Sequence, residues 1–154
     1  MQISSPEFQN NGNIPSKFTC DGKGINPALE ISDVPVGAKS LALIMDDPDI
    51  PETVKQNYGI EVWEHWLVWN ISPDTKEIKE NSIPSGAVVG RGTRSLDIYT
   101  PPCPPDREHR YFFKLYALDT VLDLDKNSGA ADLEKAMAGH IIKKAELIGK
   151  YNRK

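Results

Sequence analysis

Cysteine is scarce in this 154-residue sequence, and long hydrophobic runs are absent. Cys20 and Cys103 are too few and too far apart for a disulfide framework or a metal-binding motif. No apolar stretch approaches the roughly 20 residues that a membrane-spanning helix needs, and the N-terminus lacks the basic and apolar regions of a signal peptide. These absences predict a soluble, cytoplasmic protein with two reduced thiols. A single disulfide between the two cysteines is the alternative, because its formation depends on the distance between the two residues in the fold.

Basic residues are also fewer than acidic ones. The chain has 18 Lys and Arg against 22 Asp and Glu, a net charge of -4. A nucleic-acid partner is therefore not expected, because such proteins carry a basic surface that follows the phosphate backbone. With 39% hydrophobic and 26% charged residues, the composition is that of an ordinary globular protein. The length predicts a single domain over residues 1–154, and no internal repeat is visible.

Short apolar runs dominate the first two-thirds of the chain and are separated by proline and glycine. The clearest runs cover residues 41–45, 65–71 and 111–118. Each is apolar at nearly every position, which predicts a strand that is buried on both faces or central in its sheet. The intervening segments 47–51, 52–61 and 100–105 are predicted loops, and four prolines make the last of these a rigid rim. The pattern is typical of a mainly β protein with a sandwich of sheets.

The last part of the chain has a different composition. Leu133, Ala136, Met137 and His140 follow the spacing i, i+3, i+4 and i+7, which predicts a short amphipathic helix with these residues on one face. Gly139 is a candidate for its end. Residues 141–151 fit either a helix or a strand, and we favour a strand because Gly149 would weaken a helix by about 1 kcal/mol.

Polar residues stand next to the apolar runs at three points. Asp47 follows the first predicted strand, where a rigid sheet presents side chains to a cleft. His65 opens the second strand, and at strand period it shares a face with Leu67 and Trp69. Each of these residues taken alone is more often structural: an Asp in an Asx-Pro turn, or a histidine at the rim of a core.

The third point is the start of the last predicted strand. At strand period His109 and Tyr111 point to one side, while Arg110 points to the other, where it can brace the loops behind the pocket as an ion-pair partner of a buried Asp. Asp47, His65, His109 and Tyr111 together would form a set of donors around one carboxylate. Such a set suits a small anion, because the carboxylate can hold a neighbouring imidazole protonated or accept a hydrogen bond from a phosphate hydroxyl.

Three alternatives follow from the same residues. Asp47, His65 and His109 form the two-histidine, one-carboxylate set of non-heme iron enzymes. Cys103 could be a nucleophile paired with His109. The polar segment 52–61 and the proline rim could instead form the contact surface of a protein-interaction or inhibitor module without a physiological small ligand. These alternatives stay open at the level of sequence.

Several ordered blocks of the sequence resemble the phosphatidylethanolamine-binding protein family, in its bacterial and archaeal Raf-kinase-inhibitor-like branch. The resemblance covers nearly the whole chain. It rests on the following blocks: Phe-Thr-Cys-Asp-Gly at 18–22, Asp-Pro-Asp-Ile-Pro at 47–51, His-Trp-Leu-Val-Trp-Asn-Ile at 65–71, Pro-Cys-Pro-Pro at 102–105, His-Arg-Tyr-Phe-Phe-Lys-Leu-Tyr-Ala-Leu at 109–118, and Ala-Met-Ala-Gly-His at 136–140.

The resemblance implies a mainly β fold in which a central antiparallel sheet packs on a smaller sheet, with a short C-terminal helix. It implies a non-enzymatic protein without a cofactor that binds phosphate-like anions or phospholipid headgroups in a shallow pocket. The family's pocket positions correspond here to Asp47, His65, Pro104, His109 and Tyr111. Eukaryotic relatives are associated with kinase regulation, so a protein partner is a further expectation, and homodimerisation stays open.

The sequence departs from the family pattern at the rim of the expected pocket. Pro101 stands where relatives usually have glycine, and residues 106–108, Asp-Arg-Glu, replace glycine or small residues. The segment 92–97 is altered as well. Pro101 offers no backbone N-H to an anion, and the acidic pair around Arg107 adds negative charge beside the expected pocket.

Overall fold

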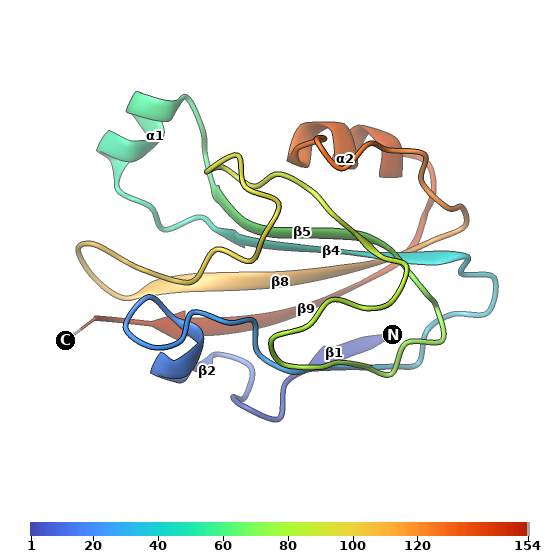
Figure 1. Cartoon of the computed structure of the whole chain (residues 1–154), viewed down its shortest axis with the longest axis horizontal. Helices are drawn as coiled ribbons and strands as arrows, with labels where there is room; N and C mark the ends of the chain where they lie inside the picture. Colours follow the sequence, from blue (N-terminus) through green and yellow to red (C-terminus); the bar gives the residue numbers. More distant parts are fainter. Residues whose placement is uncertain (154) are drawn as a thin grey trace.

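A six-stranded sheet forms the centre of the computed structural model, which describes residues 1–153 (Figure 1). In spatial order its strands are β2 (Gly12–Asn13), β9 (Ile141–Tyr151), β8 (His109–Leu118), β4 (Ser40–Asp47), β5 (Trp63–Ile71) and β7 (Val88–Val89). All neighbours are antiparallel except β2 and β9. The apolar runs predicted as central strands are β4, β5 and β8, which confirms their placement.

A second, smaller sheet packs against one face of this central sheet. It contains β1 (Gln2–Ser4), β3 (Leu29–Ser32) and β6 (Glu77–Ile78). The main core lies between the two sheets, with residues such as Ile3 and Ile31 from the small sheet against Leu43 and Phe113 from the large one. Burial of such side chains from water drives the two layers together. The expected fold, a central antiparallel sheet packed on a smaller one, is therefore confirmed.

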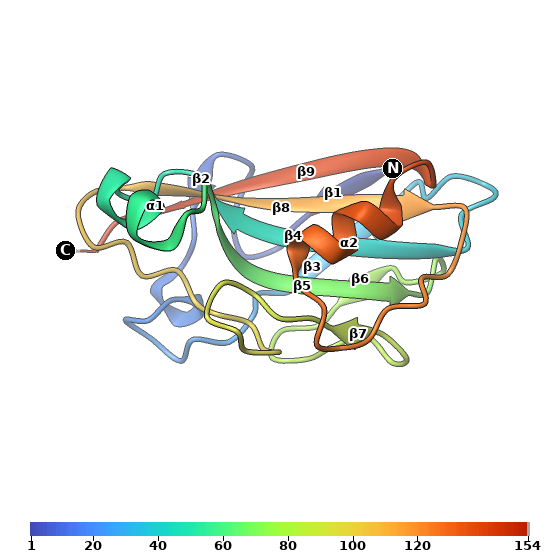
Figure 2. The same ribbon diagram turned by 90° about the horizontal axis from the view of Figure 1, so that it is seen from above.

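Helix α2 (Ala130–Met137) covers the opposite face of the large sheet, as Figures 1 and 2 show. Leu133 and Met137 of the helix pack on Ile44, Leu67 and Trp69. The predicted helix is confirmed, but it ends before His140, because Gly139 turns the chain with a φ of 80°. The segment after it is the long strand β9, as favoured from the position of Gly149.

Two further helices are short. The 3-10 helix η1 spans Ser16–Phe18, and α1 spans Glu52–Tyr58. The second corrects the sequence prediction of a loop over residues 52–61. Pro51 precedes α1, and Gly59 ends it in the left-handed conformation that glycine favours after a helix. No helix in the described part of the chain combines the length and apolar character needed to cross a bilayer.

Candidate anion-binding pocket

Three central strands have an end in common, and the expected site residues lie there. Strand β4 ends at Asp47, whereas its antiparallel neighbours β5 and β8 begin at Trp63 and His109. Because antiparallel strands run in opposite directions, the end of one meets the beginnings of its neighbours. The register places Asp47 opposite Trp63 and Asp46 opposite Phe112. The topology therefore brings together polar residues that are up to 62 positions apart.

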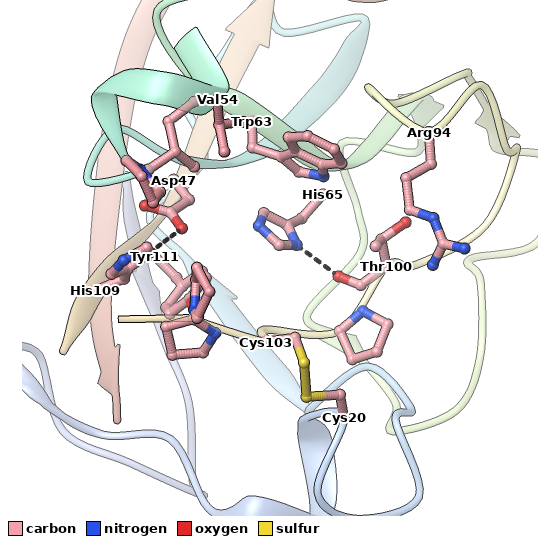
Figure 3. Close-up of a pocket in the computed structure, with 15 residues that line it drawn as sticks. Cys20, Asp47, Val54, Trp63, His65, Arg94, Thr100, Cys103, His109 and Tyr111 are labelled. Carbon is pink, nitrogen blue, oxygen red and sulfur yellow. Dashed lines mark hydrogen bonds and ion pairs between the residues drawn. A yellow bond between two sulfur atoms is a disulfide. The ribbon is translucent and has the colours of Figure 1, made fainter. Parts of the chain in front are cut away.

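A cavity of about 310 Å³ opens at this end of the sheet (Figure 3). This is near the lower limit of the roughly 300 to 1,000 Å³ that small-molecule pockets occupy. The expected residues Asp47, His65, Pro104, His109 and Tyr111 all line it. The other lining residues are Cys20, Ile50, Pro51, Val54, Trp63, Arg94, Thr100, Pro101, Cys103 and Pro105. Most of the wall is apolar, with a few polar groups at defined positions, as is usual for ligand sites.

A β-bulge in β5 determines the direction in which His65 points. Trp66 lies opposite Met45 and the next pair is Glu64 opposite Asp46, so His65 is the extra residue between the two pairs. A bulge of this kind places two residues of one strand against one of its partner and re-aims a side chain. The regular alternation of faces is interrupted at His65.

The bulge overturns one expectation from the sequence. We expected His65 to share a face with Leu67 and Trp69, but those two side chains pack beneath α2. The ring of His65 instead meets that of Tyr111, which belongs to the core between the sheets, with ring centroids 5.3 Å apart. The prediction assumed an uninterrupted strand period, and the inserted residue turns His65 into the pocket.

The proton on His65 is located by one hydrogen bond. Its Nδ1 lies 2.8 Å from the carbonyl oxygen of Thr100. A carbonyl only accepts, so Nδ1 carries the proton and the neutral ring presents a bare Nε2. Burial lowers the pKa of His65 below its usual value, despite the Thr100 carbonyl and the charge of Asp47. The Nε2 atom has no hydrogen-bond partner among residues 1–153.

The pKa of His109 is shifted in the opposite direction from that of His65, because His109 lies between two carboxylates. Its Nδ1 is 2.7 Å from Asp47 and its Nε2 is 2.7 Å from Asp106. Burial by itself would lower the pKa of His109, but hydrogen bonds to Asp47 and Asp106 and their charges raise it above its usual value. His109 is therefore a cation whose charge is already offset and whose two nitrogens are both occupied.

Tyr111 completes the inner end of the pocket. Its side chain is fully buried, and its ring stacks near that of His109, with centroids 6.5 Å apart. Burial and the nearby charge of Asp47 raise the pKa of Tyr111, so the phenol stays protonated. Its hydroxyl, like Nε2 of His65, has no hydrogen-bond partner among residues 1–153. Two buried polar atoms at the inner end of one cavity are thus available to a ligand.

The Asp47 carboxylate also shapes the loop that follows β4. One of its oxygens accepts the N-H of Asp49 at 2.8 Å, which is the Asx-type turn expected from the sequence. Asp49 in turn binds Arg110 through two side-chain hydrogen bonds of 2.8 Å. Hydrogen bonds from Arg110, opposed by partial burial, hold the pKa of Asp49 at about 2. The predicted role of Arg110 as a brace behind the pocket agrees with this geometry.

The proline rim forms the outer wall of the pocket and is bridged to the N-terminal part of the chain. Cys20 and Cys103 form a disulfide, with Cα atoms 5.4 Å apart. The expectation of two reduced thiols was wrong because the cysteines are 83 residues apart and only the tertiary fold makes them neighbours. The N-H of Cys20 also donates to the carbonyl of Pro102 at 3.0 Å. These links hold the rim against residues 16–24.

The bridge removes one alternative, because Cys103 has no thiol to act as a nucleophile. The donor geometry likewise gives no support to a metal site of Asp47, His65 and His109. Both nitrogens of His109 already face carboxylates. Within residues 1–153, no three His, Cys, Asp or Glu side chains are arranged to hold a metal ion.

Sequence reasoning missed several members of the site. Trp63 was not singled out, yet it lines the cavity together with Val54 of α1. Asp106 was treated as a rim charge and is a direct partner of His109. Arg94, at the outer end, was noted only as part of an altered segment. No local pattern marks these residues: Trp63 is the first residue of β5 and Val54 lies in α1, while Arg94 and Asp106 come from irregular segments.

Together the two packed sheets and the cavity at the ends of β4, β5 and β8 define a β-sheet protein with a small-molecule pocket. The profile of the phosphatidylethanolamine-binding protein family matches residues 4–152. The chain is 46% identical over 158 residues to the UPF0098 protein of Methanothermobacter thermautotrophicus, a match that covers 99% of each. This chain is therefore a member of the phosphatidylethanolamine-binding protein family, as its motifs predicted.

Solved structures agree with this assignment. A putative phosphatidylethanolamine-binding protein homologue from Chlamydia trachomatis has 44% identity and a TM-score of 0.94, with 99% of this chain and 97% of that chain covered. Escherichia coli YbcL, described as a member of the mammalian family, has 30% identity and a TM-score of 0.88, with coverage of 99% and 98%. These likenesses extend over the whole arrangement of sheets described above.

Proposed function

We propose that this protein is a non-enzymatic binder of a small acidic group, such as a phosphate or a phosphate-bearing headgroup. The observation that carries the proposal is the pair of buried, unpartnered polar atoms at the inner end of the pocket, Nε2 of His65 and the hydroxyl of Tyr111. Leaving a buried polar atom unpaired costs roughly 1–3 kcal/mol, so a ligand that satisfies both atoms gains that amount for each. Both atoms are almost fully covered, so entry requires a small shift of the rim.

The charges around the inner end determine which ionic form is bound. The positive charge of His109 is offset by Asp47 and Asp106, and His65 is neutral. At this inner end, no positive charge is left over for a fully ionised anion. The group at His65 must therefore arrive with a proton that it donates to Nε2, or His65 must take up a proton on binding. In both cases affinity falls as the pH rises, by up to roughly tenfold per pH unit.

The remaining pocket residues contribute shape. Pro104 lines the cavity and has no N-H to offer, so its contribution is a fixed apolar wall. Asp47 holds His109 in place and stands ready to accept a hydrogen bond from a protonated headgroup. The disulfide between Cys20 and Cys103 leaves no thiol at the pocket to act as a nucleophile.

The test is isothermal titration calorimetry with phosphate, phosphoethanolamine and sulfate at about pH 6 and about pH 8, on either side of the usual histidine pKa of about 6.5. Measurements in two buffers of different ionisation enthalpy count the protons taken up. Phosphate and phosphoethanolamine should bind more tightly at the lower pH. Sulfate carries no proton in this range, so its binding should take up one proton at His65.

Variants connect the binding to the site. Tyr111→Phe should weaken binding roughly tenfold, since it removes one hydrogen bond to a charged group without a large change in volume. His140→Gln is the matched control, because His140 is exposed and pairs with Asp119 away from the pocket. Undiminished affinity in the double variant His65→Ala, His109→Ala would rule out this site.

A protein partner is the second candidate, and one feature favours it. Helix α1 buries none of its residues, contributes Val54 to the pocket wall, and leaves Tyr58 61% exposed beside Trp63. A partner that covers α1 and the proline rim would close the pocket. Tyr58→Ala should weaken such a complex while leaving phosphate binding intact. Analytical ultracentrifugation tests whether the partner is a second copy of this chain.

A further inference from the structure

Arg94 lies at the opposite end of the pocket from His109, with His65 between them (Figure 3). Its side chain is exposed, and it has no hydrogen-bond or ion-pair partner within residues 1–153. The neighbouring Thr93 is tied to the start of β5: its N-H donates to the Glu64 carbonyl at 3.1 Å, and its hydroxyl accepts the N-H of Glu64 at 2.8 Å. The backbone at Arg94 is thereby held next to the strand that carries His65.

The other cations at the pocket are already occupied. His109 pairs with Asp47 and Asp106, and Arg110 pairs with Asp49. The side chain of Arg107 donates to the carbonyl oxygens of Asp49 and Glu108 at 3.2 and 3.1 Å. Arg94 also lies on the cavity wall, but none of these acceptors pairs with it. A guanidinium is always charged and offers a planar fork of donors that matches a carboxylate or phosphate.

Building on the proposed function, we propose that Arg94 determines specificity by binding a second anionic group at the outer end of the ligand. The ligand class is then a short, flat molecule with acids at both ends. The inner acid binds at His65 and Tyr111. Either it carries a proton that it donates to His65, or His65 takes up a proton on binding. The apolar body lies against Trp63 and Pro101, and the outer acid pairs with Arg94. A cavity of about 310 Å³ leaves room for a body of one ring.

The proposal is tested with two probes of the same body, phenyl phosphate and 4-carboxyphenyl phosphate. The native protein should bind the carboxylated probe roughly two- to fivefold more tightly, the range for a solvent-exposed ion pair. Arg94→Gln should abolish this difference, so that the variant binds the two probes with equal affinity. High salt should reduce the difference, because an exposed ion pair is screened.

Arg91→Gln is the matched control, since Arg91 is in the same irregular segment but binds Asn127 and does not line the cavity. It should keep the full preference for the carboxylated probe. Equal binding of the two probes to the native protein, with both weakened by Tyr111→Phe, overturns the role of Arg94 and leaves the proposed function standing. Failure of both probes to bind at the pocket overturns both proposals. Thermal melts of each variant verify that it is folded.

Discussion

The Nδ1 atom of His65 lies 2.8 Å from the carbonyl oxygen of Thr100, and this hydrogen bond determines that Nε2 is the nitrogen facing the pocket. The bond joins the bulge of β5 to the first residue of the proline rim. The rim is in turn bridged to the N-terminal region through Cys103 and Cys20. The protonation and orientation of His65 therefore depend on the hydrogen-bonded and covalent links of the proline rim.

The two pocket histidines should titrate on opposite sides of the usual value of about 6.5. His65 should titrate lower, because burial disfavours its charged form. His109 should titrate higher, since Asp47 and Asp106 outweigh the effect of burial. NMR titration of the imidazole protons measures both. Asp106→Asn should lower the pKa of His109 and leave that of His65 nearly unchanged. A His109 that titrates below 6 would contradict the assignment of its charge.

The buried pair of Asp47 and His109 should contribute to stability in a pH-dependent way. The folded-state pKa of His109 is raised, so the stabilisation is complete below its unfolded value of about 6.5 and is lost as the pH rises through the folded-state pKa. Asp47→Ala should cost roughly 3–5 kcal/mol at about pH 6, the range for breaking a buried ion pair. Urea unfolding of the native protein and the variant near pH 6 and near pH 9 measures this loss of unfolding free energy. The loss should be smaller at the higher pH.

Reduction of the Cys20–Cys103 bridge should destabilise the fold and loosen the pocket. A bridge that closes a loop of this length lowers the entropy of the unfolded chain, which stabilises the folded state by roughly 4 kcal/mol. Urea unfolding with and without a dithiol reductant measures that loss. Phosphate binding should weaken as well, because the rim that carries Thr100 loses its covalent link and is then held by hydrogen bonds, such as those between Cys20 and Pro102 and between Thr100 and His65.

The control for this experiment is the double variant Cys20→Ser, Cys103→Ser. It should resemble the reduced native protein and should show no further response to the reductant. An unchanged phosphate affinity after verified reduction would mean that the hydrogen bonds and packing of the rim suffice to position His65.

Gly90 tests the close packing between the irregular segment after β7 and the large sheet. A Cβ atom at this position would lie 2.2 Å from the ring of Trp69, which is fully buried beneath α2. Gly90→Ala should therefore destabilise the protein by roughly 1–3 kcal/mol, as overpacking of a core does. Gly129→Ala is the control, since its Cβ would meet only the Arg91 carbonyl at an ordinary 3.6 Å. Thermal unfolding followed by circular dichroism compares the two.

Local patterns in the sequence were sufficient for the framework of the fold. The continuous apolar runs in β4, β5 and β8 indicated central strands, because a strand that is buried on both faces leaves few polar positions. Strand period was also sufficient to place His109 and Tyr111 on one side and Arg110 on the other, since β8 is regular there. These inferences succeed where each residue's environment follows from its immediate neighbours.

The sequence by itself therefore determined the central strands β4, β5 and β8, the helix before β9 and the family, because hydrophobic runs, helical spacing and ordered motifs are local properties. Only the tertiary structure decided that Cys20 meets Cys103, that the bulge turns His65 away from Leu67, and that Arg94 reaches the outer end of the pocket. Each of these depends on how segments distant in the chain pack together. The contacts that give the pocket its charge and its unpaired atoms are of this second kind.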